Sequence, residues 1–296
     1  MAIKGIGIDI CSSRINGRLA LLERDLAYYA DCGFEYVEIP VHGVDAIFAG
    51  RLLEPRMRRA KEILAQFELR YTVHAPDLVN LFDVERLPVH KAVLRSTLIF
   101  ARQIGAEVVV YHAGAVNFLN EDLGLGEERL KEIEREALIE IADETADWGV
   151  SIAVENGRLD SYSSHLPALV EQVRAIGRPN VGITFDFGHA FLSACWRGFD
   201  LYQATRLAAP HVIHIHAHDN FGVAMDVPSG MPYIDQAPLG VGDLHMPPGW
   251  GAVPYQELLT GLETPPAVFL LELHPRWMDV APQALEMARR LAALMG

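Results

Sequence analysis

The stretch VIHIHAHD at residues 212–219 alternates apolar residues with histidines. Successive side chains of a β-strand point to opposite faces, so the three histidines share one face, and Ile213, Ile215 and Ala217 share the other. The apolar face is expected to pack on helices, and the histidines are expected to face the axis of a barrel. The stretch therefore predicts a buried strand that carries imidazoles into a site.

Six further segments end on an imidazole or a carboxylate where an apolar run stops. They end at His74, at His112, at Glu155, at Asp186 with His189, at Asp243 with His245, and at Glu272. In a barrel of alternating strands and helices, the carboxyl ends of the parallel strands meet at one rim. Imidazole and carboxylate are ligands of Zn²⁺, Mn²⁺ and related ions. The pattern therefore predicts a metal centre at that rim.

Eight short apolar runs alternate with amphipathic stretches. The runs are Ile3–Ile8, Tyr36–Ile39, Leu69–His74, Glu107–His112, Val150–Val154, Val181–Asp186, Val212–His216 and Ala267–Glu272. The amphipathic stretches include Arg18–Asp31, Leu52–Phe67, Pro88–Ile104, Glu127–Trp148, Leu166–Ile176 and Pro282–Leu294. Eight β/α units predict an α/β fold, a (β/α)8 or TIM barrel, as a single domain over residues 1–296. A doubly wound open sheet is the alternative, but it would carry its ligands at one switch point.

Composition limits the classes of function. The 296 residues include 25 Lys and Arg against 39 Asp and Glu, which gives a net charge of −14. Such a field repels nucleic acid and anionic membranes. Three cysteines without CxxC spacing are typical of free thiols in a reducing compartment. Because the start reaches Asp9 before any signal-peptide core and no run approaches about 18 apolar residues, we expect a cytoplasmic protein without a membrane partner.

The connection from Asp219 to Pro254 is about three times longer than a typical loop and is rich in proline and glycine. We expect it to be irregular. It is interpreted either as a lid over the site or as an interface loop, and the second interpretation is compatible with a homo-oligomer.

Four strand-end residues are candidates for a single ion: Glu155, Asp186, His216 and Glu272. This set leaves coordination positions for substrate oxygens, and a carboxylate that binds metal can still carry a proton. A single strand-end acid is as often an ion pair or a helix cap. Four on one rim favour a metal.

Five more residues form a second ring of candidate ligands: His74, His112, His189, Asp243 and His245. A lone histidine is more often a hydrogen-bonded core residue, but nine candidates on one rim favour ligation. His218 and His274 are candidates for supporting positions beside the ligands. His214 is expected one layer below the site. The remaining histidines are interpreted as surface or packing residues: His42, His90, His165 and His211.

Substrate contacts are predicted for residues that follow the strands. Arg158 and Arg276 would reach a phosphate or carboxylate group, although a solvated arginine is the commoner role. Trp250 would form an apolar wall against a sugar. His189 and His218 complete the predicted substrate-binding set. Weaker candidates of the same two kinds are Arg14, Arg197, Phe118, Trp196 and Trp277.

The chain resembles the xylose isomerase-like barrel superfamily, which includes sugar phosphate isomerases and epimerases as well as endonuclease IV. The resemblance covers nearly the whole chain. It rests on His74-Ala-Pro, Tyr-His112-Ala-Gly, Ala-Val-Glu155-Asn, Phe-Asp186-Phe-Gly-His189-Ala, His214-Ile-His216-Ala-His218-Asp219-Asn220, Asp243-Leu-His245-Met-Pro-Pro-Gly-Trp-Gly and Leu-Glu272.

Each branch implies its own metal content. The isomerase and epimerase branch implies that the residues of the four-residue set hold one divalent ion, and that Glu155 and Glu272 move the proton. The endonuclease IV branch implies that all nine candidate ligands hold three zinc ions, which cleave a DNA phosphodiester. Asp77 disfavours this branch, because it follows His74-Ala-Pro where a DNA-opening tyrosine is expected. With a net charge of −14, the protein also lacks the electrostatic attraction to the phosphate backbone that DNA binding needs.

We therefore predict a metal-dependent isomerase or epimerase, with Mn²⁺ or Zn²⁺, acting on a sugar, a sugar phosphate or a related polyol ketone. Proton transfer by the two glutamates would proceed through an enediolate. Lyase or dehydratase chemistry is a near variant. The alternative is a phosphodiesterase that holds up to three metal ions. A barrel that is stabilised by metal and serves only in binding is a third hypothesis. For the predicted isomerase or epimerase, no nucleic-acid partner is expected.

Overall fold

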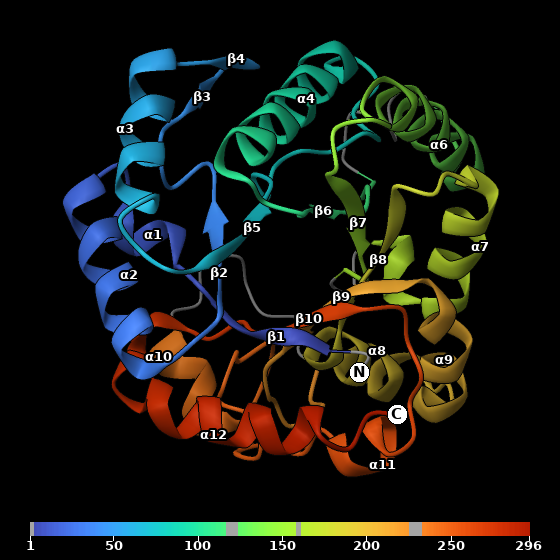
Figure 1. The fold of residues 1–296 in the computed structure, drawn as a ribbon. Coiled ribbons are helices and arrows are strands. Elements are labelled where there is room, and N and C mark those ends of the chain that lie inside the picture. Colours follow the sequence, from blue (N-terminus) through green and yellow to red (C-terminus); the bar gives the residue numbers. More distant parts are fainter. Residues whose placement is uncertain (1–2, 117–123, 158–160, 225–232) are drawn as a thin grey trace.

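The computed structural model of the protein describes residues 3–116, 124–157, 161–224 and 233–296. Parallel strands form a closed barrel at its centre in the order β1-β10-β9-β8-β7-β6-β5-β2, and helices surround it (Figure 1). The barrel strands are β1 (Ile3–Asp9), β2 (Tyr36–Pro40), β5 (Arg70–His74), β6 (Val108–His112), β7 (Ser151–Glu155), β8 (Val181–Asp186), β9 (Val212–Ala217) and β10 (Ala267–Leu271). The predicted TIM barrel is confirmed, and each predicted strand is found to within one residue at either end.

Helices follow the strands and pack on the outside of the barrel (Figure 1). They are α1 (Ser12–Ile15), α2 (Leu19–Cys32), α3 (Glu54–Leu64), α4 (Leu87–Ile104), α6 (Glu127–Glu144), α7 (Leu166–Ile176), α8 (Phe187–Arg197), α9 (Leu201–Ala208), α10 (Tyr233–Gln236), α11 (Tyr255–Leu259) and α12 (Ala281–Ala292). Helix α7 illustrates why they form: it buries apolar residues at helical spacing, has proline in its first turn and ends at Gly177 with a φ of 58°. A short hairpin, β3 (Ile47–Phe48) with β4 (Arg51–Leu52), follows β2.

Apolar side chains fill both sides of the barrel wall. The main core lies between strands and helices and includes Val109 of β6 and Val154 of β7. Inside the barrel, one small cluster consists of Tyr36, Val268 and Leu270 and another of Val108, Val110 and Ala153. A Cβ at Gly7 would lie 2.9 Å from Tyr36 Cβ, so that glycine is required by close packing. The barrel is therefore plugged below, and a site forms only at its rim.

The predicted inward alternation holds with one exception. Ala153 and Leu270 belong to the interior clusters, as expected for residues below Glu155 and Glu272. Ile213, predicted on the outer face, instead packs against the interior cluster of Val108, Val110 and Ala153. The cause is a register shift between β8 and β9, which turns the first residues of β9 relative to the rest of the strand.

The long connection after β9 is fastened to the barrel by Asp219. Its backbone pairs in both directions with Met246, at 2.7 and 3.1 Å, and its buried carboxylate accepts from the backbone N–H groups of Gly249 and Val253. The connection also contains regular turns, α10 and a 3₁₀ turn at Ala237–Leu239, where an irregular chain was expected. Its part at 225–232 lies outside the described residues. The lid and interface interpretations stay predictions.

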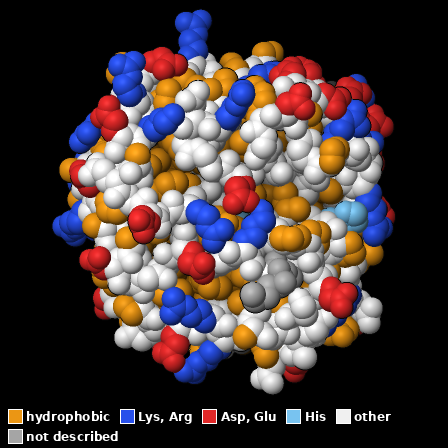
Figure 2. Space-filling view, viewed as in Figure 1, with side chains coloured by type: hydrophobic (Ala, Val, Ile, Leu, Met, Phe, Trp, Pro, Cys, Tyr) orange, Lys and Arg blue, Asp and Glu red, His pale blue; other side chains and the backbone are white. Residues whose placement is uncertain are grey.

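On the face of the molecule shown in Figure 2, basic and acidic side chains are interspersed with apolar ones. This face has no stripe of one sign. No helix in the described part of the chain is long and apolar enough to cross a membrane.

Candidate metal centre

The four predicted ligands of a single ion come together at the rim. Glu155 and Asp186 end β7 and β8, His216 lies in β9 and Glu272 follows β10, and these strands are neighbours in the barrel. One ligand atom from each lies within 4.8 Å of the others. His216 Nδ1 lies 3.0 Å from Glu155 Oε1 and 3.2 Å from Glu272 Oε2. Asp186 Oδ2 lies 3.9 Å from the same nitrogen.

Asp186 is held in place by hydrogen bonds to His189 and Asn156. Phe187 begins helix α8 directly after β8, and Asp186 is the N-cap of this helix. The capping carboxylate oxygen Oδ1 accepts from His189 N at 2.6 Å. Asn156 fixes the end of β8, because its side chain accepts a hydrogen bond from Asp186 N and donates one to Asp186 O, both at 2.8 Å.

A second group consists of His74, His112 and Glu155. His112 Nε2 lies 3.0 Å and His74 Nε2 lies 3.6 Å from Glu155 Oε2. The other oxygen of Glu155 faces His216. Glu155 therefore belongs both to this group and to the group of Asp186, His216 and Glu272.

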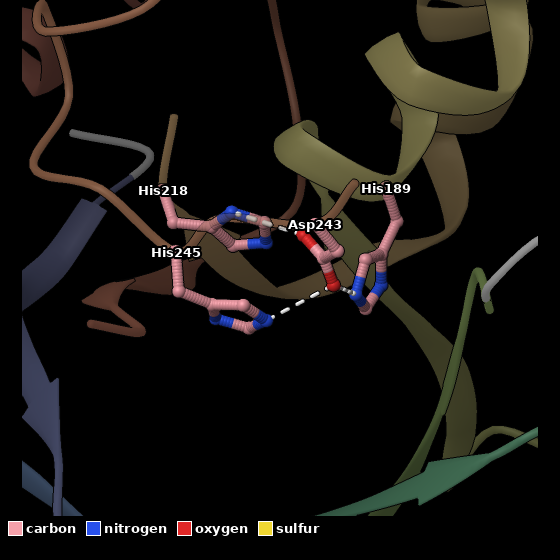
Figure 3. A group of neighbouring side chains, drawn as sticks. All are labelled: His189, His218, Asp243 and His245. Atoms are coloured by element: carbon pink, nitrogen blue, oxygen red, sulfur yellow. Dashed lines mark hydrogen bonds and ion pairs between the residues drawn. The ribbon is translucent and has the colours of Figure 1, made fainter. Parts of the chain in front are cut away.

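A third group, His189, His218, Asp243 and His245, is drawn in Figure 3. Asp243 Oδ2 lies 2.9 Å from His189 Nε2 and 3.0 Å from His245 Nε2. The His218 and His245 rings stack, with centroids 3.9 Å apart. His218 was predicted beside the ligands and in the substrate-binding set, and here it belongs to a candidate ligand group. Gly188 makes room for it, because a Cβ there would lie 2.1 Å from His218 Cε1.

The residues present fit a divalent cation. Within the described part of the chain, Glu155 Oε2, Asp186 Oδ2 and Glu272 Oε2 are buried without a hydrogen-bond partner, as are both ring nitrogens of His218. Such atoms are unfavourable unless something satisfies them. Asp186 Oδ2 and His218 Nε2 lie 3.1 Å apart without being aligned for a hydrogen bond. Metal ligands are expected to lie close together in this way without bonding to one another, because each directs a lone pair toward the ion. Mixed imidazole and carboxylate donors suit Zn²⁺ or Mn²⁺.

The electrostatics are those of a tightly packed charge cluster. Burial opposes charging of the His74 imidazole, but the Glu155 and Glu38 carboxylates outweigh it and raise the pKa of His74 to about 10. Burial likewise opposes charge on Glu155, yet His216 and His112 hold the pKa of Glu155 well below its ordinary value. Without a cation His74 therefore carries a balancing proton, and an ion that binds to its ring must displace that proton.

A pocket of about 200 Å³ opens beside the four-residue group. This is smaller than the roughly 300–1,000 Å³ of pockets for drug-sized ligands, so the space suits a small polar molecule. Its lining residues include Asp9, Ser12, Glu38, His42, His74, Asp77, His245 and Glu272.

Sequence reasoning did not assign three ionisable residues of this lining to the site: Asp9, Glu38 and His42. His42 was interpreted as a surface or packing residue, and this was wrong, because its half-buried side chain lines the pocket. Asp9 and Glu38 were not assigned to the site. All three lie in or just after the first two apolar runs, so the strand-end rule applied to the other runs would have found His42 and Asp9. Glu38 was obscured because it lies one residue inside an apolar run.

The other predicted substrate residues lie elsewhere or are not described. Arg158 lies outside the described residues. The Arg276 guanidinium lies over the Trp277 ring, 4.8 Å from its centroid, and Trp250 packs edge-on against Trp277 at 5.1 Å. Within the described chain, neither Arg276 nor Trp250 is among the lining residues of the pocket beside the four-residue group. Their roles, like the substrate roles of His189 and His218, stay predictions.

Several solved structures share this architecture. A D-tagatose 3-epimerase-like protein superposes with a TM-score of 0.72 at 22% identity, covering 98% of both chains. D-psicose 3-epimerase from Clostridium cellulolyticum H10 gives 0.69 at 16% identity, covering 97% of this chain and 99% of the other. The IolI protein with a bound zinc atom gives 0.67 at 16% identity, covering 98% and 96%. At these identities the likeness establishes the fold.

Sequence comparison adds the family. The uncharacterized protein MJ1311 of Methanocaldococcus jannaschii is 31% identical over 173 residues, which are 54% of this chain and 55% of that protein. The match thus spans about half the length of this relative. Residues 26–293 match the family described as xylose isomerase-like TIM barrel. With the closed barrel and the ligands on its rim, the chain therefore belongs to the xylose isomerase-like TIM barrel family.

Proposed function

We propose that the protein is a divalent-metal-dependent isomerase or epimerase acting on a small sugar, a sugar phosphate or a related polyol ketone. One observation carries this proposal: two glutamate oxygens, of Glu155 and Glu272, flank the same His216 nitrogen at 3.0 and 3.2 Å. Glu272 also lines the small pocket. The 3-epimerases named above share the fold, which supports a carbohydrate substrate but leaves the sugar open.

The chain's own residues would perform the proton transfer. When bound, a divalent ion would supply Lewis acidity to the substrate carbonyl. Glu155, Asp186, His216 and Glu272 would hold that ion. One glutamate would remove the proton from the carbon next to the carbonyl, and the other would return a proton, to the opposite face in an epimerase.

The other two ligand groups support a second candidate function. The group around His112 and the group around Asp243 each offer ligand atoms within 4.8 Å of one another, so three ions could be held. That content would suit a metal-dependent phosphodiesterase. Asp77, an exposed acid lining the same pocket, disfavours a phosphodiester ligand. We therefore place the isomerase first and expect no nucleic-acid partner.

Metal content and substrate screening test the two functions together. Elemental analysis of the purified protein is expected to give Mn²⁺ or Zn²⁺, and chelation is expected to lower both turnover of ketoses and the melting temperature. One ion per chain with ketose turnover supports the isomerase. Three ions with cleavage of bis(p-nitrophenyl) phosphate and no ketose turnover would replace it with the phosphodiesterase. A protein equally active after chelation would contradict both.

A further inference from the structure

Glu38 is a buried carboxylate inside the barrel that the proposed proton transfer does not use. It lies in β2, and the residue is 1% exposed. Its neighbours Val37 and Ile39 belong to the outer core, so strand alternation turns Glu38 toward the barrel axis. Burying a charge at this depth is unfavourable unless the charge has partners.

The partners of Glu38 come from distant strands. Thr72 Oγ1 donates to Glu38 Oε2 at 2.8 Å, and His214 Nε2 lies 3.0 Å from the same oxygen. The other oxygen, Oε1, lies 3.0 Å from His216 Nε2. Both histidines lie in β9, which is separated from β2 by β1 and β10. The Glu38 carboxylate therefore reaches across the barrel interior to a candidate metal ligand.

His216 thus has a carboxylate on each side of its ring. Nδ1 faces Glu155 and Glu272, while Nε2 faces Glu38. In the described structure, His216 Nε2 and Glu38 Oε1 are buried, lie 3.0 Å apart and have no hydrogen-bond partner. A small rotation of the imidazole would align them. A histidine that binds metal through one nitrogen commonly donates its other N–H to a carboxylate, which fixes the tautomer and the ring orientation.

We propose that Glu38 is a positioning residue of the metal centre. Its carboxylate accepts the Nε2 proton of His216 and so directs the Nδ1 lone pair toward Glu155, Asp186 and Glu272. Thr72 and His214 hold the carboxylate in place. This role rests on the proposed metal-dependent function, because it concerns the ligand His216. It differs from ligation by Glu38 itself, which the grouping of Glu38 with His214 and His216 would also permit.

The test compares E38Q with E134Q. Glu134 is a matched control, because it is also a fully buried carboxylate, accepts from Tyr111, Tyr162 and Gly114, and belongs to none of the ligand groups. The dissociation constant for Mn²⁺ is measured by calorimetry, and the absorption spectrum of bound Co²⁺ reports ligand geometry. We expect E38Q to bind Mn²⁺ about 10- to 100-fold more weakly, with one ion still bound at saturation and an altered Co²⁺ spectrum. E134Q is expected to keep the wild-type constant and spectrum.

A milder variant covers the case in which E38Q does not fold. T72V removes only the hydroxyl that supports Glu38, and it is expected to weaken Mn²⁺ binding in the same direction by a smaller factor. Wild-type affinity and spectrum in folded E38Q, or in T72V if E38Q is unfolded, would overturn the positioning role. Loss of one equivalent of metal in E38Q would overturn it in favour of ligation. A wild-type protein that binds no divalent ion would instead overturn the proposed function, on which this role depends.

Discussion

Asp186 Oδ1 accepts a hydrogen bond from the backbone N–H of His189 at 2.6 Å, so one carboxylate both caps helix α8 and faces the candidate metal centre. Its second oxygen is buried and points to His218 Nε2, 3.1 Å away. The first turn of α8 is thereby tied to the ligands. A substitution at Asp186 affects helix stability and metal binding through different oxygens, and these effects can be separated.

D186N and D186A separate the two effects, because both remove the charge but only asparagine keeps an N-cap acceptor. In EDTA, D186A is expected to be less stable than D186N by about 1 kcal/mol in urea unfolding. Both are expected to bind Mn²⁺ much more weakly than wild type. Equal stability of the two variants would show that the cap contributes nothing, and wild-type Mn²⁺ affinity in D186N would remove Asp186 from the ligands.

Asp219 is expected to hold the segment that carries Asp243 and His245. Its carboxylate accepts from three backbone N–H groups, of Asn220, Gly249 and Val253. D219A leaves these three donors, of which those of Asn220 and Val253 belong to buried residues, without their acceptor, so we expect a loss of about 3 kcal/mol in the free energy of unfolding. Hydrogen exchange is expected to accelerate at residues 246–253.

An exposed hydroxyl provides the control for this prediction. The Thr260 hydroxyl donates only to the exposed carbonyl of Gln256, so T260A is expected to stay within about 0.5 kcal/mol of wild type. Wild-type protection of residues 246–253 in D219A would mean that other contacts fasten the segment.

Asp9 is expected to make metal-free stability depend on pH. Burial, followed by the nearby charge of Glu272, raises the pKa of Asp9 to about 7. Because the unfolded carboxyl ionises near pH 4, the native state binds the extra proton between about pH 4 and pH 7, and its stability falls as pH rises through this window. D9N does not titrate, and its amide oxygen can still accept from Leu273 N, as Asp9 Oδ1 does.

The stability of D9N relative to wild type is therefore expected to rise with pH, by at most about 1.4 kcal/mol per pH unit. Urea unfolding in EDTA from pH 5 to pH 8 measures this difference. A difference that stays flat or shrinks with pH would mean that Asp9 is ionised in the native protein throughout the range.

The barrel and most members of the candidate ligand groups could be predicted because their signals are local. Alternation marks each strand, and a strand end places its last side chain on the rim wherever the strand lies in the barrel. This rule brought Glu155 and Glu272 to one site across more than 100 residues. It needs no knowledge of which strands are neighbours.

The missed features depend on tertiary register or on competing local signals. The turn of Ile213 into the barrel follows from how β9 pairs with β8, which no residue in β9 reveals. Glu38 meets His216 only because the closed barrel sets β2 across from β9. Gly188 lies in the first turn of helix α8, where glycine disfavours a helix, and the reason for that glycine is the His218 ring packed against it.

Exchange of the substrate's carbon-bound hydrogen with deuterated water tests the proposed proton transfer. Wild-type protein loaded with Mn²⁺ is incubated with ketopentoses, ketohexoses and their phosphates, and deuterium is located by NMR. We expect one deuterium at the carbon next to the carbonyl of a turned-over sugar. Exchange is expected to fall at least about 100-fold in metal-filled E155Q and E272Q, and to stay unchanged in E134Q. Exchange at the wild-type rate in both metal-filled glutamine variants, or no exchange with any ketose in the wild type, would contradict it.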